Sequence, residues 1–148
     1  MNMVSRALAR RQKGEKGFTL VELLVVVIII GILAAVSVPI YLNQRKSAWN
    51  SNAEQDAKNA MTVTETVMTA NGGKLPTDFA VDCDASTSNS ASKVTVDGQD
   101  YTCSAGVHLT VAKSDDNLTY TISADHANGT KTYTYDSKTN SALQSTDK

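Results

Sequence analysis

Apolar side chains are gathered in one long run near the start of the chain. Residues 18–42 contain a single charged side chain, Glu22, and no other segment has an apolar run of comparable length. About 20 consecutive apolar residues are enough for a helix to cross the hydrocarbon core of a bilayer. The pattern therefore predicts one membrane-spanning helix over residues 18–42. It excludes a uniformly soluble globule and a protein with several membrane spans.

The helical pattern continues over residues 43–71, now with one apolar face. Small and apolar side chains recur there at intervals of three and four residues, at Trp49, Ala53, Ala57, Ala60, Thr64 and Val67. Gly72 and Gly73 end the pattern, and Pro76 follows them. A single helix over residues 18–71 would be about 80 Å long at about 1.5 Å per residue.

Two residues weaken this predicted helix. Pro39 cannot donate a hydrogen bond to the carbonyl of Ala35, and its ring clashes with that group. Gly31 is about 1 kcal/mol less favourable than Ala inside a helix. We expect a bend or local melting of the helix between Gly31 and Pro39.

The pattern changes to a period of two after residue 93. Val94–Val96 and Tyr101–Cys103 flank the dipeptide Asp97-Gly98, which is a turn signal for a β-hairpin. A longer hairpin loop that also includes Gln99 and Asp100 stays open as an alternative.

Further alternating segments follow at residues 107–111, 118–122 and 133–135, each with one apolar and one Thr-rich face. Residues 72–93 show little periodicity and are predicted to form an irregular, exposed connection. The fold class is therefore α+β. A long N-terminal α-helix is expected to pack its amphipathic half on the apolar face of a small antiparallel β-sheet.

Charge is divided unevenly along the chain. The 148 residues carry a formal net charge of −1, but residues 1–17 hold five Lys and Arg against one Glu, a net charge of +4. From residue 18 onward nine basic residues face fourteen acidic ones, a net charge of −5. Basic residues before a span keep the N-terminus in the cytoplasm. The acidic remainder argues against a nucleic-acid-binding arm. A secretory signal peptide cleaved before Val38 remains an alternative.

The start of the apolar run resembles the N-terminal motif of type IV prepilins, in the segment KGFTLVELLVV at residues 16–26. The resemblance implies cleavage between Gly17 and Phe18 by a prepilin peptidase, followed by N-methylation of Phe18. It implies that Glu22 pairs with the terminal amine of another subunit during assembly. Gly31 and Pro39 lie where such pilins commonly have a helix-weakening glycine and a proline. The implied architecture is pilin-like.

The resemblance also implies an organisation and a function. Residues 1–17 would be a leader peptide, 18–42 a transmembrane and filament-core helix, 43–71 an amphipathic helical half, and 72–148 a connecting loop with a β-sheet head. The protein would be a structural subunit of a type IV pilus and not an enzyme, with a role in adhesion, motility or DNA uptake.

The implied partners are other pilin subunits, the prepilin peptidase, the pilus assembly platform and the membrane. No nucleic-acid site is evident. The chain would lie in the bacterial cytoplasmic membrane with its N-terminus inside before assembly, and in an extracellular pilus afterwards. Two alternatives stay open: a pseudopilin or minor pilin of a type II secretion or competence system, and a membrane-anchored or secreted binding domain.

The remaining reactive side chains are few. Cys83 and Cys103 lie outside the predicted span, where one pair of cysteines in a small domain favours a disulfide, with free thiols as the alternative. Two Cys and two His exclude a zinc ribbon or finger. His108 and His126 are expected to be surface residues, and Asp82, Asp84, Asp115 and Asp116 lack the spacing of a calcium loop. No catalytic, cofactor-binding or metal site is predicted.

Overall fold

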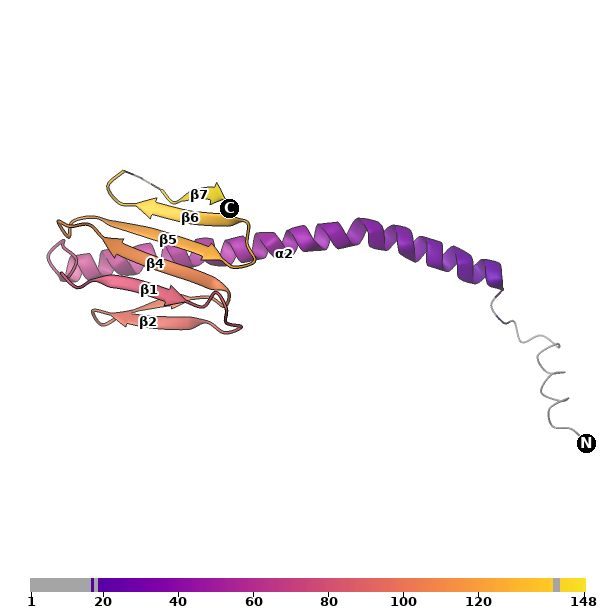
Figure 1. The fold of residues 1–148 in the computed structure, drawn as a ribbon, viewed down its shortest axis with the longest axis horizontal. Helices are drawn as coiled ribbons and strands as arrows, with labels where there is room; N and C mark the ends of the chain where they lie inside the picture. Colours follow the sequence, from indigo (N-terminus) through magenta and orange to yellow (C-terminus); the bar gives the residue numbers. More distant parts are fainter. Residues whose placement is uncertain (1–16, 18, 140–141) are drawn as a thin grey trace, which may run out of the picture. The chain divides into compact units, whose positions relative to one another are not determined.

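The computed structural model describes residue 17 and residues 19–139 and 142–148. Residues 1–16 of the predicted leader (residues 1–17) and Phe18 lie outside these described residues. The chain divides into two compact units, Met1–Tyr41 and Leu42–Lys148. Along the described chain, Figure 1 shows α2 (Leu20–Ala70), β1 (Ala80–Asp84), β2 (Ser92–Val96), β3 (Gln99–Cys103), β4 (Val107–Lys113), β5 (Tyr120–His126), β6 (Lys131–Asp136) and β7 (Gln144–Asp147).

The helix α2 agrees closely with the predicted limits of residues 18–71. It stays helical through Gly31 and Pro39, so local melting is wrong, while the bend between these residues stays a prediction. Pro39 removes one hydrogen bond from a long ladder, and the bonds on either side are enough to continue the helix. The hydroxyl of Ser37 donates to the carbonyl of Leu33 at 2.7 Å within this stretch.

The C-terminus of α2 is closed by its two glycines. Gly72 has a φ of 68°, and the N–H of Gly73 donates to the carbonyl of Met68 at 2.7 Å. This is the hydrogen bond of a Schellman motif, which needs a left-handed residue just after the helix. The predicted stop signal therefore has a specific structural cause.

The strands form two antiparallel sheets. The larger has the order β1-β4-β5-β6-β7, and the hairpin β2-β3 forms a separate two-stranded sheet between β1 and β4 in the sequence. The hairpin turns at Asp97 and Gly98, both with positive φ, and Gln99 already pairs with Val96. The predicted hairpin with its turn at Asp97-Gly98 is therefore confirmed, and the alternative longer loop is wrong, because a two-residue turn with both residues in the left-handed region closes the hairpin.

Three further strand predictions are corrected by the structure. β1 lies inside residues 72–93, which the sequence predicts to be irregular, and its Val81 and Cys83 are buried. Ala85 just after β1 is also buried, and its N–H donates to the carbonyl of Val107 at 2.9 Å. β5 begins at Tyr120, which leaves Leu118 in a turn with 49% of its surface exposed. β7 is an additional edge strand.

The core of the unit Leu42–Lys148 lies between the second half of α2 and one face of the larger sheet (Figure 1). The buried residues of α2 are Ala53, Asp56, Ala57, Ala60, Thr64 and Val67, so five of the six predicted positions are buried and Trp49 is partly exposed. The sheet contributes buried side chains that include Val81, Leu109, Val111, Tyr120 and Ile122. The α+β fold with a helix packed on an antiparallel sheet is confirmed.

Polar contacts fix the helix on the sheet at three levels. The N–H of Ser104 donates to the carboxylate of Asp56 at 2.6 Å, and Thr64 shares a 3.1 Å hydrogen bond with the phenol of Tyr101. The phenol of Tyr120 donates to Glu65 at 2.6 Å. Buried polar groups are costly without partners, so these bonds select one register of the helix on the sheet.

Candidate functional site

The first half of α2 exposes an apolar surface along its whole length. From Leu20 to Leu42 every large apolar side chain is between 47% and 84% exposed. Complete burial of one Leu, Ile or Val is worth about 1.5–3 kcal/mol, so this segment requires an apolar environment such as lipid or other helices. By length and composition α2 is suited to cross a membrane, and none of its most apolar window is buried.

The helix begins with a reciprocal pair of hydrogen bonds. The N–H of Thr19 donates to Glu22 Oε2 at 2.9 Å, and the N–H of Glu22 donates to Thr19 Oγ1 at 3.2 Å. This is a capping box, in which two otherwise unpaired N–H groups of the first turn find acceptors. The sequence signal was available as Thr-x-x-Glu at residues 19–22, but the resemblance had assigned Glu22 only to a partner subunit.

The position of Glu22 also suits its charge. It lies in the first turn of α2, where the unpaired N–H groups carry partial positive charge that favours a carboxylate. Oε2 is used by the cap, while Oε1 accepts no hydrogen bond from the described residues. One carboxylate oxygen is therefore available to a cationic donor outside this part of the chain.

Of the remaining predicted site residues of the N-terminal unit, Gly31 and Pro39 lie inside α2 and Gly17 lies before it. Gly17 precedes the helix and is exposed, whereas Phe18 lies outside the described residues. A Cβ built on Gly17 or Gly31 would meet nothing within 4 Å, so neither glycine is required by close packing in the described structure.

The two cysteines join the two sheets. Cys83 of β1 and Cys103 of β3 form a disulfide with a Cα–Cα distance of 6.1 Å, and both side chains are completely buried. Because the bond connects the edge of the larger sheet to the β2-β3 hairpin, it holds the hairpin against the core. Neither cysteine is a free thiol, which removes both from nucleophilic chemistry in this state.

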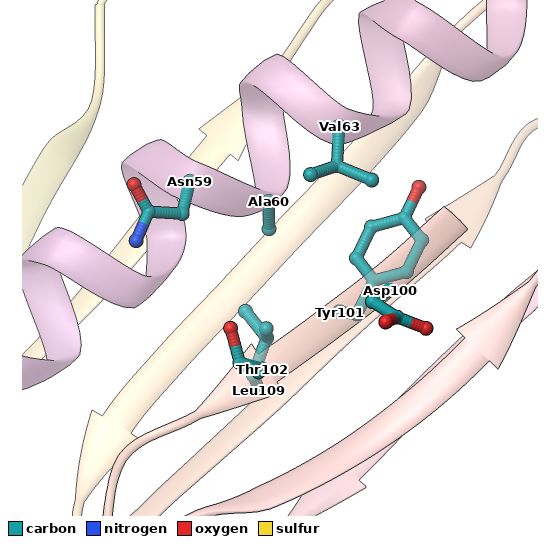
Figure 2. A pocket seen from close by; sticks show the side chains of 7 residues that line it. All are labelled: Asn59, Ala60, Val63, Asp100, Tyr101, Thr102 and Leu109. Carbon is teal, nitrogen blue, oxygen red and sulfur yellow. The ribbon is translucent and has the colours of Figure 1, made fainter.

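A small pocket beneath α2 cannot hold a substrate. Figure 2 shows Ala60 and Val63 of the helix facing Tyr101 and Leu109 across it. Its volume of about 20 Å³ is comparable to that of a single water site. Its lining side chains serve packing, and Tyr101 uses its hydroxyl on Thr64.

The titratable groups of the head are shifted by burial. Burial raises the pKa of the Asp56 carboxyl, although hydrogen bonds from Ser104 oppose the change. Burial and the neighbouring Glu65 carboxylate raise the pKa of the Tyr120 phenol. Burial lowers the pKa of His126, which is only 4% exposed and stacks on Trp49 with ring centroids 5.6 Å apart. The prediction of a surface position is therefore wrong for His126.

The other histidine lies on the outer face of the sheet. His108 Nε2 is 2.9 Å from Asp82 Oδ1, and both side chains are well exposed. Within the described residues no group of three or more His, Cys, Asp or Glu side chains is arranged to hold a metal ion. Asp116 accepts a hydrogen bond from the N–H of Leu118 at 3.0 Å, as expected of a turn carboxylate.

The N-terminal segment of the chain matches a known family model. Residues 12–38 match the family model described as the prokaryotic N-terminal methylation motif. The chain is similar to the fimbrial protein EcpB of Eikenella corrodens, with 40% identity over 63 residues that cover 43% of this chain and 38% of that relative. The similarity thus spans well under half of the relative's length. No solved structure matches the chain.

Proposed function

We propose that the chain, which matches the prokaryotic N-terminal methylation motif over residues 12–38 and is similar to a fimbrial protein, is a structural subunit of a type IV pilus. The observation that carries the proposal is the contrast between its two units. The described residues of Leu20–Tyr41 expose their large apolar side chains, whereas the unit from Leu42 onward has a closed core and its own disulfide. Such a chain can pack into a filament by its helix and present its head to the surroundings.

Processing is the first proposed step. A prepilin peptidase would cut between Gly17 and Phe18, remove the basic leader of residues 1–17 and methylate Phe18. The exposed Gly17 supports this, because a residue without a side chain fits an extended substrate strand in a protease cleft. The leader, with its net charge of +4, would keep this bond at the cytoplasmic face of the membrane.

Assembly is the second proposed step. Residues 18–42 would leave the lipid and pack against the same segments of other subunits, driven by burial of apolar surface. Glu22 would accept the positively charged amine of Phe18 of a neighbouring subunit through its second oxygen. A charge pair inside an apolar bundle specifies register more than it adds stability. The contact is heterologous, so successive copies form an open helix.

The pilus would serve adhesion, motility or DNA uptake, and the assembly platform of the membrane would supply subunits to its base. Residues 43–71 and 72–148 would form the surface-exposed head. In this proposal the catalysis belongs to the peptidase, and the subunit has a structural role.

The proposed cleavage between Gly17 and Phe18 provides the test. In a bacterium with a prepilin peptidase, Gly17→Glu should leave a full-length precursor in the membrane fraction and abolish surface filaments, whereas Gly17→Ala should still allow shortening. Immunoblots of membrane and sheared fractions would show this. A correctly shortened product from Gly17→Glu would contradict the assigned bond.

A further inference from the structure

A polar groove runs between α2 and the start of β6 in the unit Leu42–Lys148. It has a volume of about 500 Å³ and opens to the surface. We call it the polar groove; its lining residues on α2 are Asn43, Lys46, Ser47, Asn50, Ser51 and Glu54, and those beside β6 are Thr130, Lys131 and Tyr133. The helical residues follow one another at intervals of three and four, so they form one face of α2.

The walls of the polar groove are fixed by Asn50. Its Oδ1 accepts hydrogen bonds from the N–H groups of Thr130 at 2.9 Å and Lys131 at 3.2 Å, and its Nδ2 donates to Thr130 Oγ1 at 3.0 Å. A Cβ on Gly129 would lie 2.7 Å from the same Oδ1, so glycine permits this approach. The groove is therefore pre-formed and needs no rearrangement to accept a partner.

The polar groove has two basic lining residues and one acidic one. Lys46 and Lys131 form no ion pair with the described residues, whereas Glu54 is already paired with Lys58 at 2.6 Å. The same unit has nine basic and thirteen acidic residues from Leu42 onward. Two uncompensated ammonium groups on an acidic unit indicate an anionic partner.

A complementary surface lies at the opposite end of the head. The turn between β4 and β5, residues 114–119, exposes Asp115, Asp116 and Leu118, and we call it the acidic tip. In Figure 1 this turn lies at the end of the sheet next to the C-terminus of α2. Leu118 is the one large apolar side chain that the described residues beyond Leu42 expose.

Backbone contacts hold the acidic tip in one conformation. The N–H of Ser114 donates to the carbonyl of Thr119 at 2.8 Å, and Asn117 has a φ of 60°. The N–H of Leu75 donates to the carbonyl of Asn117 at 2.9 Å, which ties the tip to the segment after α2. The tip is a firm projection that presents one apolar and two anionic side chains.

We propose that the acidic tip of one copy docks in the polar groove of a second copy, with Asp115 and Asp116 facing Lys46 and Lys131. The inference rests on the proposed filament function and adds a contact between heads to it. Within the head, Asn50 and Ala70 are separated by about 30 Å along α2. The tip lies near the C-terminus of α2, where Asn117 accepts a hydrogen bond from the N–H of Leu75 (Figure 1). Contacting copies are thus shifted by at least about 30 Å along this helix. The two surfaces differ, so the contact repeats without closing.

Cysteine cross-linking in assembled filaments tests the docking. The full chain with Ser51→Cys and Asp115→Cys should give a ladder of disulfide-linked oligomers after mild oxidation of sheared filaments. Each single variant should give none. The matched control joins Asp115→Cys to Ala91→Cys, an exposed position remote from the groove lining, and should remain monomeric. Intact filaments without a ladder would overturn the docking and leave the proposed function standing.

Charge reversal provides a second measurement that needs no added cysteine. Lys131→Glu and Asp115→Lys should each lower, several-fold, the salt concentration at which filaments dissociate. The double variant should restore most of this loss. Additive losses in the double variant would overturn the pairing. A second result would also overturn the docking: heparin binds the wild type and not Lys131→Glu, and both filaments dissociate at the same salt concentration. That result would assign the groove to an anionic polysaccharide. A wild-type chain absent from filaments would overturn both the docking and the proposed function.

Discussion

Thr19 and Glu22 hold each other through two reciprocal hydrogen bonds at the first turn of α2, at 2.9 and 3.2 Å. The same carboxylate that the proposed assembly requires is therefore oriented by its own chain. Glu22 therefore has two separable roles. It accepts a hydrogen bond from the N–H of Thr19, and it offers a negative charge to a neighbouring subunit. Two substitutions distinguish them.

The first substitution removes the charge and keeps the cap. Glu22→Gln retains an oxygen that can accept from the N–H of Thr19, since Gln also serves in capping boxes. We expect normal cleavage and normal folding of the head, but a loss of most surface filaments. Quantitative immunoblots of sheared and membrane fractions measure both. Wild-type filament yield from Glu22→Gln would contradict the pairing of charges.

The second substitution removes the cap and keeps the charge. Thr19→Ala should destabilise the first turn of α2 by about 1 kcal/mol, because the N–H of Glu22 loses its side-chain acceptor. Faster hydrogen exchange of the amides at residues 21–23 in detergent micelles would show this. Thr19→Ser should preserve the protection. Unchanged exchange in Thr19→Ala would show that the cap does not stabilise the helix start.

The disulfide should stabilise the head by constraining its unfolded chain. Cys83 and Cys103 are 20 positions apart, and closing a loop of this size is worth about 3 kcal/mol. The double variant Cys83→Ala and Cys103→Ala should therefore unfold at a lower temperature than the oxidised wild type. Added reductant should lower the unfolding temperature of the wild type only. Equal unfolding temperatures of the oxidised wild type and the double variant would contradict this role.

Acid should weaken the head through His126. Burial lowers its pKa in the folded state, so folding favours the neutral imidazole. The stabilising contribution is present above the unfolded pKa of about 6.5 and is lost as the pH falls through that value towards the folded pKa. Unfolding temperatures between pH 7.5 and 5 should fall less steeply for His126→Phe than for the wild type.

The helix was the most predictable element. A long apolar run and the spacing of Ala53, Ala57 and Ala60 encode α2 locally, and Gly72 and Gly73 encode its end. The sheet was only partly predictable. β1 alternates two buried side chains with Asp82 and Asp84, which are uncommon in strands, so its pairing with β4 overrides a weak local signal.

Other features depend on contacts that the pattern does not contain. All four residues of β7 are exposed, so their side-chain pattern does not predict a strand. The strand is determined by backbone pairing with β6. His126 is buried because Trp49 covers its ring, a contact between residues far apart in the sequence. Asn50 has the pattern of any polar residue of an amphipathic helix, and only the fold brings it to its hydrogen-bond partners Thr130 and Lys131. The capping box, by contrast, was readable from residues 19–22.

The account depends most on where the finished protein begins. Mass spectrometry and N-terminal sequencing of the chain from sheared surface filaments measure this directly. The account predicts N-methylated Phe18 followed by Thr19 and Leu20. A chain that begins at Met1 or at Val38 would contradict it, the first by retaining the basic leader and the second by removing most of the apolar segment.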